Sequence, residues 1–144
     1  MRRFQFNLEK VLKFRKYRER ETEIELGRAI GALTIIQNSL KENAANHNQA
    51  AEERFVQTDI RDIQYYDLYV RRLEIEKEKL LREAAQAALV IEEKRAVYLE
   101  ASRDRKVLDK LREKREKEYR KTMLTEETKA LDDIASLALA RNRL

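Results

Sequence analysis

The chain has 144 residues, of which 41% are Asp, Glu, Lys or Arg, and it contains no proline, no cysteine and only two glycines. This composition excludes disulfides, thiolate metal sites and a cysteine nucleophile, and 42% of hydrophobic residues is too little for a multilayered globular core. A mean hydropathy of -0.79 and a net charge of +5 favour long helices that share a narrow apolar seam.

The first predicted helix runs from about residue 4 to residue 54. Its less polar residues recur at alternating spacings of four and three, which is the period of a coiled-coil seam. The seam positions are Leu8, Leu12, Arg15, Glu19, Thr22, Leu26, Ala29, Leu33, Ile36, Leu40, Asn43, His47 and Ala50. Gly27 and Gly31 interrupt good helix formers, which indicates a local bend, a close approach by another helix, or glycines that the surface simply tolerates.

A stretch rich in Asn, Asp and Thr predicts the connection between the helices at about residues 54–60. These residues favour turns and helix ends because their short side chains compete for backbone hydrogen bonds. Thr58 or Asp59 is expected to cap a second helix that starts near Ile60.

The second predicted helix covers about residues 60–141. Its seam positions are Leu73, Lys77, Leu80, Ala84, Ala87, Ile91, Lys94, Tyr98, Ala101, Arg105 and Leu108. Because each seam is too polar to stand alone, we expect the two to pack together. The prediction is an all-α protein with a single coiled-coil domain over residues 1–144, a long antiparallel two-helix hairpin whose C-terminal helix is the longer. Leucines and isoleucines after residue 120 would then lie on an overhang that needs a partner.

Positive charge is concentrated in two segments. Residues 1–20 carry eight Lys or Arg against two Glu, and residues 101–121 carry ten against five acidic residues. Antiparallel pairing brings both segments to one end of the hairpin, with residue 15 expected near residue 101. One basic end and a mildly acidic remainder are therefore predicted.

The sequence argues against catalysis. His47 is the one histidine and has no neighbour at metal-ligand spacing, and no glycine-rich phosphate loop is present. We expect no catalytic residues, no metal, no cofactor and no small-molecule ligand. No apolar run reaches the roughly 18 residues of a membrane span, so a cytoplasmic protein is expected.

Two binding alternatives remain for the basic end. The basic residues alternate with acidic ones and lack aromatic stacking partners, so nucleic acid is not expected as a partner, although a basic nucleic-acid-binding rod stays an alternative. A basic helix with Phe and Leu on one face could also lie at a membrane interface.

Aromatic residues cluster just after the predicted connection. Tyr65, Tyr66 and Tyr69 precede Leu73, and a thin coiled coil has too little core to bury all of them. Tyrosine supplies contact area at low entropic cost, which favours an interface. The alternative is that the rings wrap the tip of the hairpin.

Both ends of the chain carry distinctive sequence motifs. The amino-terminal pattern is Phe4-x-Phe6-x-Leu8-x-Lys10-Val11-Leu12-x-x-Arg15. The carboxy-terminal patterns are Leu108-x-x-Leu111-Arg112-x-Lys114-Arg115-x-x-x-Tyr119 and Glu127-x-Lys129-x-Leu131-Asp132-Asp133-Ile134-Ala135. These motifs resemble those of the FliJ family of flagellar export proteins, and the resemblance covers the whole chain in length and architecture.

The resemblance implies a non-enzymatic coiled coil similar to the central stalk of rotary ATPases. In the family, the terminal end enters the hexameric ring of the flagellar export ATPase and promotes its assembly and activity. Another face contacts the export gate membrane protein, and the family also escorts export chaperones. The protein would lie in the cytoplasm, peripherally associated with the inner membrane at the flagellar basal body.

The resemblance also suggests site residues. Those expected at the ATPase are Phe4, Phe6, Leu8, Lys10, Val11, Leu12, Arg15, Leu111, Arg112, Arg115 and Tyr119. Those expected at the export gate are Tyr66, Tyr69 and Leu73, whereas Asn43, Asn46 and His47 stand where the family may place aromatic residues on the first helix. A structural homo-oligomeric coiled coil, with the overhang paired to a second copy, is the remaining alternative.

Overall fold

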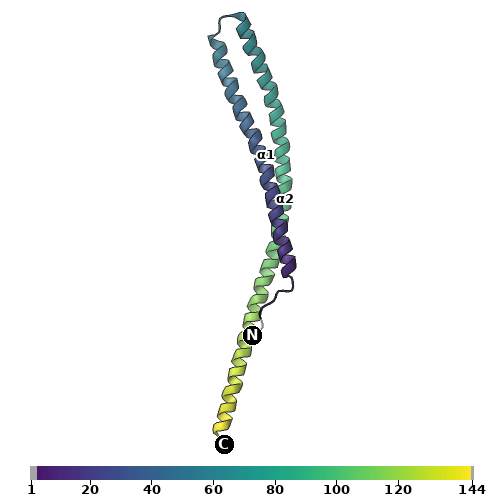
Figure 1. The fold of residues 1–144 in the computed structure, drawn as a ribbon, viewed down its shortest axis with the longest axis vertical. Helices are drawn as coiled ribbons and strands as arrows, with labels where there is room; N and C mark the ends of the chain where they lie inside the picture. The colour runs from purple at the N-terminus through teal and green to yellow at the C-terminus, as the bar shows by residue number, and fades with distance from the viewer. Residues whose placement is uncertain (1–2, 144) are drawn as a thin grey trace. The chain divides into compact units, whose positions relative to one another are not determined.

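A computed structural model describes residues 3–143. Helix α1 spans Glu9–Val56 and helix α2 spans Ile60–Asn142, and the described chain contains no other helix and no strand. The two helices pack against each other as an antiparallel hairpin (Figure 1). The predicted all-α hairpin with a longer second helix is therefore confirmed.

Helix α1 begins at Glu9, so the predicted start near residue 4 is wrong. Before it, the chain turns where the Glu9 N–H donates to the Phe6 carbonyl over 3.1 Å. Phe4 and Phe6 are two residues apart, and a helix would turn two such side chains to nearly opposite sides. In the non-helical segment, both pack in the cluster that contains Leu108. The non-helical start therefore lets both rings pack on α2.

The connection between the helices is residues 57–59, inside the predicted range. Asp59 caps α2, because its Oδ1 accepts a hydrogen bond of 3.0 Å from the Arg61 backbone N–H. The Asp59 carbonyl accepts the first helical bond, from the Ile63 N–H at 3.1 Å. Of the two expected caps, the structure uses Asp59.

The predicted seams are the buried stripes of both helices. Every predicted seam position of α1 is buried or half-buried, and in α2 only Lys77 is exposed. A lysine can cover a seam with its methylene groups while its ammonium group stays in water. The alternating spacing of four and three thus identified the packing face along both helices.

The contacts within the chain fall into two compact units. Unit 1 comprises residues 1–19 and 101–144, and unit 2 comprises residues 20–100. Each unit contains a segment of both helices. The single domain expected from the sequence stays a prediction.

In unit 2, a buried polar residue fixes the pairing of the helices. Asn43 is 5% exposed, and its Nδ2 donates a hydrogen bond of 2.9 Å to the backbone carbonyl of Leu73 on α2. Ion pairs flank the seam, with Arg54 bound to Asp67 at 2.6 Å. A polar side chain with a single good partner disfavours other registers, because sliding the helices would leave it buried without a hydrogen bond.

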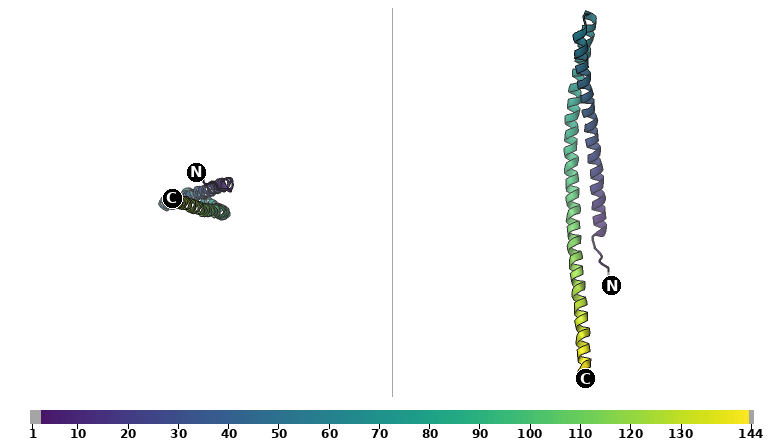
Figure 2. Two further views of the ribbon diagram at one scale, coloured as in Figure 1. Left: turned by 90° about the horizontal axis from the view of Figure 1, so that it is seen from below. Right: turned by 90° about the vertical axis from the view of Figure 1, so that its left-hand side faces the viewer.

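In unit 1, the start of α1 lies beside α2, and α2 continues past it (Figure 2). The Arg15 Nη1 donates to the Asp104 carbonyl over 2.9 Å, so residue 15 lies about one turn further along α2 than the expected position 101. Beyond Met123 the large hydrophobic residues of α2 are exposed. They are Leu124, Leu131, Ile134, Leu137 and Leu139.

The two glycines of α1 lie on open surface. A Cβ added at Gly27 or Gly31 would meet no atom within 4 Å, and neither glycine has a positive φ. The described chain makes no close helix approach here, which supports glycines that the surface tolerates.

Replacing Gly27 and Gly31 by alanine should therefore stabilise the protein. Glycine costs about 1 kcal/mol relative to alanine inside a helix, so each substitution should raise the free energy of unfolding by about 0.5–1 kcal/mol. Urea unfolding followed by circular dichroism measures this. Destabilisation by either substitution would show that the backbone bends or is approached closely at that point.

Candidate partner-binding surfaces

The terminal end of the hairpin, which we define as residues 4–19 with 101–119 of unit 1, is held by a small core. Phe6 and Leu12 of the amino-terminal segment pack with Leu108 of α2, and Leu12 is only 1% exposed. Phe4, Leu8 and Leu111 pack against this cluster. The Phe4 ring lies 5.7 Å from the Tyr119 ring, with their planes at 48°. Hydrophobic contact therefore holds the segment before α1 on the side of α2.

Two arginines of α2 also contact residues 6–9 of the amino-terminal segment, outside the hydrophobic core. The Arg112 Nε donates to a Glu9 carboxylate oxygen at 3.1 Å. The Arg115 guanidinium lies 5.7 Å from the centre of the Phe6 ring, within the range of a cation–π contact. Both contacts lie at the surface, so each adds on the order of 0.5–1 kcal/mol at most.

One charged cluster lies partly inside the terminal end. Arg105 of α2 bonds the carboxylate of Glu19 on α1 and, at 2.7 Å, that of Asp109 on its own helix. The hydrogen bonds to Glu19, and next those to Asp109, raise the pKa of Arg105 above its usual value. Arg105 therefore keeps its positive charge, and its ion pair with Glu19 joins the two helices.

The structure brings together all the residues predicted for ATPase contact, in the terminal end. They differ in exposure, and five of them are half-buried: Phe4, Leu8, Arg15, Leu111 and Tyr119. Phe6 and Leu12 are buried, so their side chains support the surface from below. Lys10, Val11 and Arg115 are exposed and form part of it. Arg2, which contributes to the predicted basic segment, lies outside the described residues.

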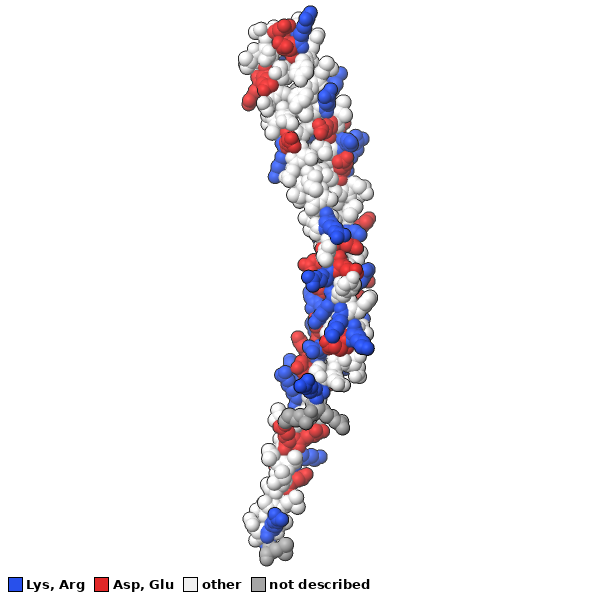
Figure 3. All heavy atoms as spheres, in the orientation of Figure 1, with Lys and Arg blue, Asp and Glu red and all other residues white. Residues whose placement is uncertain are grey.

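Sequence reasoning missed two exposed aromatic residues of the terminal end. Phe14 is 65% exposed and Tyr17 is 61% exposed. Phe14 lies one helical turn from Val11, and Tyr17 lies one turn from Phe14. Their signal in the sequence was that large apolar residues occupy positions outside the seam. Lys and Arg side chains crowd this part of unit 1, with acidic side chains among them (Figure 3).

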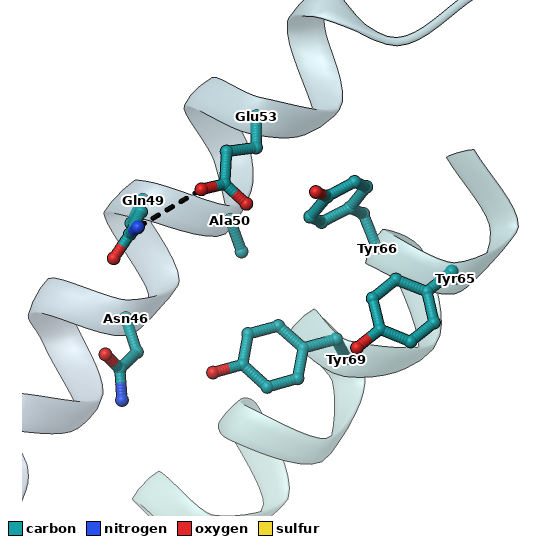
Figure 4. A pocket seen from close by; sticks show the side chains of 7 residues that line it. All are labelled: Asn46, Gln49, Ala50, Glu53, Tyr65, Tyr66 and Tyr69. Carbon is teal, nitrogen blue, oxygen red and sulfur yellow. Dashed lines mark hydrogen bonds between the residues drawn. The ribbon is translucent and has the colours of Figure 1, made fainter. Parts of the chain in front are cut away.

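A second candidate surface lies near the connection, in unit 2. Asn46, Gln49, Ala50, Glu53, Tyr65, Tyr66 and Tyr69 line a hollow of about 300 Å³, which we call the tyrosine pocket. Figure 4 shows the Tyr66 and Tyr69 rings projecting from α2 toward α1, with the Ala50 methyl group between them. The Tyr65 ring stands beside the Tyr66 ring, with centres 5.5 Å apart and planes at 80°.

A hydrogen bond across the tyrosine pocket raises the pKa of Tyr66. The bond from the Tyr66 hydroxyl to the Glu53 carboxylate raises the pKa of Tyr66 above its usual 10.0, and partial desolvation adds to the effect. Glu53 also accepts a hydrogen bond of 3.1 Å from the Gln49 Nε2. The Glu53 carboxylate thus accepts bonds from a residue of each helix.

The residues predicted for the export gate take different positions. Tyr66 and Tyr69 are half-buried in the tyrosine pocket, whereas Leu73 is 4% exposed and belongs to the helix seam. Leu73 therefore positions the surface and offers no side chain to a partner. Phe55, which the sequence did not single out, is 90% exposed at the end of α1.

Other kinds of site find little support in the described residues. Across residues 3–143, no group of three or more His, Asp or Glu side chains is arranged to hold a metal ion. His47 faces Glu74, with 3.8 Å between its Nε2 and a carboxylate oxygen. Neither helix has, within its described part, a stretch long and apolar enough for a membrane span.

Comparison with known proteins decides the family. A family model described as the flagellar FliJ protein matches residues 4–144, which is essentially the whole chain. The chain belongs to the FliJ family. No curated protein and no solved structure matches it. FliJ proteins are non-catalytic components of the flagellar protein export apparatus, and the chain is accordingly a component of that apparatus.

Truncation of the buried Leu12 side chain should destabilise the terminal end. Leu12→Ala removes a fully buried side chain and should lower the free energy of unfolding by about 2–3 kcal/mol. Its exposed neighbour provides the control, since Val11→Ala should change the same quantity by less than about 0.5 kcal/mol. Equal effects in urea unfolding would contradict the described packing of this FliJ chain.

Removal of the negative charge of Glu53, which accepts the Tyr66 hydrogen bond, should lower the pKa of Tyr66. Glu53→Gln keeps a hydrogen-bond acceptor but loses the charge, so the pKa should fall toward 10.0, as measured by NMR titration of the ¹³C-labelled Tyr66 ring. The folded-state pKa lies above the unfolded one, so this bond stabilises the protein fully below pH 10.0 and is lost as the pH rises through the folded value. Glu52→Gln, next in sequence but outside the pocket, should leave the Tyr66 pKa unchanged.

Proposed function

We propose that this FliJ chain acts as a non-enzymatic stalk for the flagellar export ATPase. Its terminal end would enter the hexameric ATPase ring and promote assembly and ATP hydrolysis. The observation that carries the proposal is that the amino-terminal segment and α2 jointly build one basic surface with exposed Val11, Phe14 and Tyr17.

The physical properties of the terminal end suit such a role. Exposed aromatic residues provide the anchors that dominate binding energy at interfaces. Surrounding Lys and Arg side chains would steer the end toward an acidic collar and keep desolvation small, because they remain at the rim. Of the predicted residues, Lys10, Val11, Arg112 and Arg115 would contact the ATPase, while Phe6 and Leu12 hold the surface in place.

The tyrosine pocket of unit 2 is the proposed contact for the export gate. Tyr66 and Tyr69 would touch the gate protein, and Leu73 would support them from the seam. A chain with separate surfaces in its two units could link the ATPase to the gate. An escort role for export chaperones belongs to the same proposal, at the cytoplasmic side of the inner membrane where the basal body lies.

Self-association is a second candidate that one observation favours. Leu131, Ile134 and Leu137 are each more than 60% exposed on the last part of α2. In a homo-oligomeric coiled coil, a second copy would cover them, and light scattering would give a multiple of 17.2 kDa.

The ATPase proposal is tested with two matched double variants. Val11→Ala with Phe14→Ala removes exposed apolar side chains of the terminal end and should raise the concentration needed for half-maximal ATPase stimulation by about tenfold or more, as for an interface anchor. Phe55→Ala with Val56→Ala removes the same chemical groups from unit 2 and should leave stimulation unchanged. ATP hydrolysis by the purified export ATPase is the measurement, after both variants are shown to be helical.

Two results would overturn the proposal. The first is no stimulation by the folded wild-type chain. The second is equal stimulation by the wild type and the terminal-end variant, which would remove the exposed surface of the terminal end from the contact.

A further inference from the structure

The tyrosine pocket contains aromatic surface that the packing of the two helices does not bury. Ala50, at 2% exposure, fills the helix seam at this level, and the rings stand around it. Tyr65 is 65% exposed and packs edge-on against Tyr66 without covering the seam. Three aromatic rings beside an open hollow of about 300 Å³ therefore leave room for a side chain from outside.

The chemical character of the hollow favours a cation. Its polar groups are the Glu53 carboxylate, the amides of Asn46 and Gln49 and the tyrosine hydroxyls, and no Lys or Arg lines it. The neutral Gln49 amide that bonds Glu53 holds the carboxylate in position without cancelling its charge. Aromatic faces attract cations through their quadrupoles, and a carboxylate adds direct attraction.

Nearby basic residues do not occupy this site. Arg54, the neighbour of Glu53 in sequence, is bound to Asp67 through two bonds of 2.6 and 3.5 Å. Residues 42–74 carry seven acidic side chains against four basic ones, so the surroundings of the hollow also favour positive charge. The site thus combines aromatic walls, an oriented carboxylate and a net negative field.

We infer that the tyrosine pocket binds the side chain of an arginine exposed on a protein partner. A guanidinium group is planar, so it stacks on a tyrosine ring while its edge donates to the Glu53 carboxylate and the Asn46 amide oxygen. A lysine ammonium group is more strongly hydrated and cannot combine stacking with a planar, two-pronged hydrogen bond. The inference deepens the proposed gate contact and depends on that proposal only for the identity of the partner.

Binding is tested on the full chain with N-acetyl-arginine amide as the probe. The citrulline analogue has nearly the same shape without the charge and is the matched control ligand. NMR spectra of ¹³C-labelled tyrosine rings should show saturable shifts at Tyr65, Tyr66 and Tyr69 with the arginine compound, while Tyr17 and Tyr98 stay unchanged. N-acetyl-lysine amide should bind at least twofold more weakly, and the citrulline compound should produce no saturable shifts.

Two variants locate the interaction. Glu53→Gln should weaken binding of the arginine compound at least threefold. Tyr65→Ala should weaken its binding about two- to fivefold, as expected for loss of one exposed cation–π contact. Glu52→Gln, an exposed carboxylate outside the hollow, should leave binding unchanged. Equal shifts with arginine and citrulline compounds, stronger binding of the lysine compound, or equal weakening by Glu52→Gln would overturn the inference.

A separate assay distinguishes this inference from the proposed function. Binding of the full chain to the cytoplasmic part of the export gate protein is measured by calorimetry. Gate binding without arginine binding would overturn only the arginine site. Arginine binding without gate binding would overturn only the assignment of this surface to the gate.

Discussion

A two-helix structure has a single helix–helix interface, and every other feature of this chain depends on that constraint. Each helix can bury only one narrow stripe, so a few residues such as Leu12, Leu73 and Ile91 provide nearly all of the deep packing. The stripe also contains polar residues. One of them, Asn43, specifies the register of the helices through its hydrogen bond to the Leu73 carbonyl. All remaining side chains face water, and partner binding must use these exposed faces.

The same constraint explains how the two candidate surfaces differ. At the terminal end, the non-helical segment with Phe4 and Phe6 folds over α2, so residues distant in sequence form one basic surface with apolar anchors. In the tyrosine pocket, three large rings stand beside the small side chain of Ala50, which leaves a hollow rather than a filled core. The proposed link between the export ATPase and the export gate would use these two surfaces of different chemistry.

Much of the fold followed from the sequence because heptad spacing directly reflects helix packing. It identified nearly all the seam positions that are buried or half-buried, and the turn residues offered Thr58 or Asp59 as the cap, of which Asp59 acts as one. The start of α1 was wrong because helix period alone cannot show that Phe4 and Phe6 gain more by packing on α2 than by extending the helix. For the sites, motif resemblance grouped buried Leu12 and Leu73 with exposed contact residues and missed Phe14, because spacing does not report how much of each side chain the partner helix covers.

The central claim is that the two units present surfaces to different partners of the export apparatus. The most direct test places a photoreactive benzoylphenylalanine at Phe14 of unit 1 or at Phe55 of unit 2, two exposed phenylalanines, and identifies what each crosslinks in flagellated cells. The account predicts that position 14 captures the export ATPase and position 55 the export gate protein. Capture of the same partner from both positions, or of the two partners in the opposite arrangement, would contradict it.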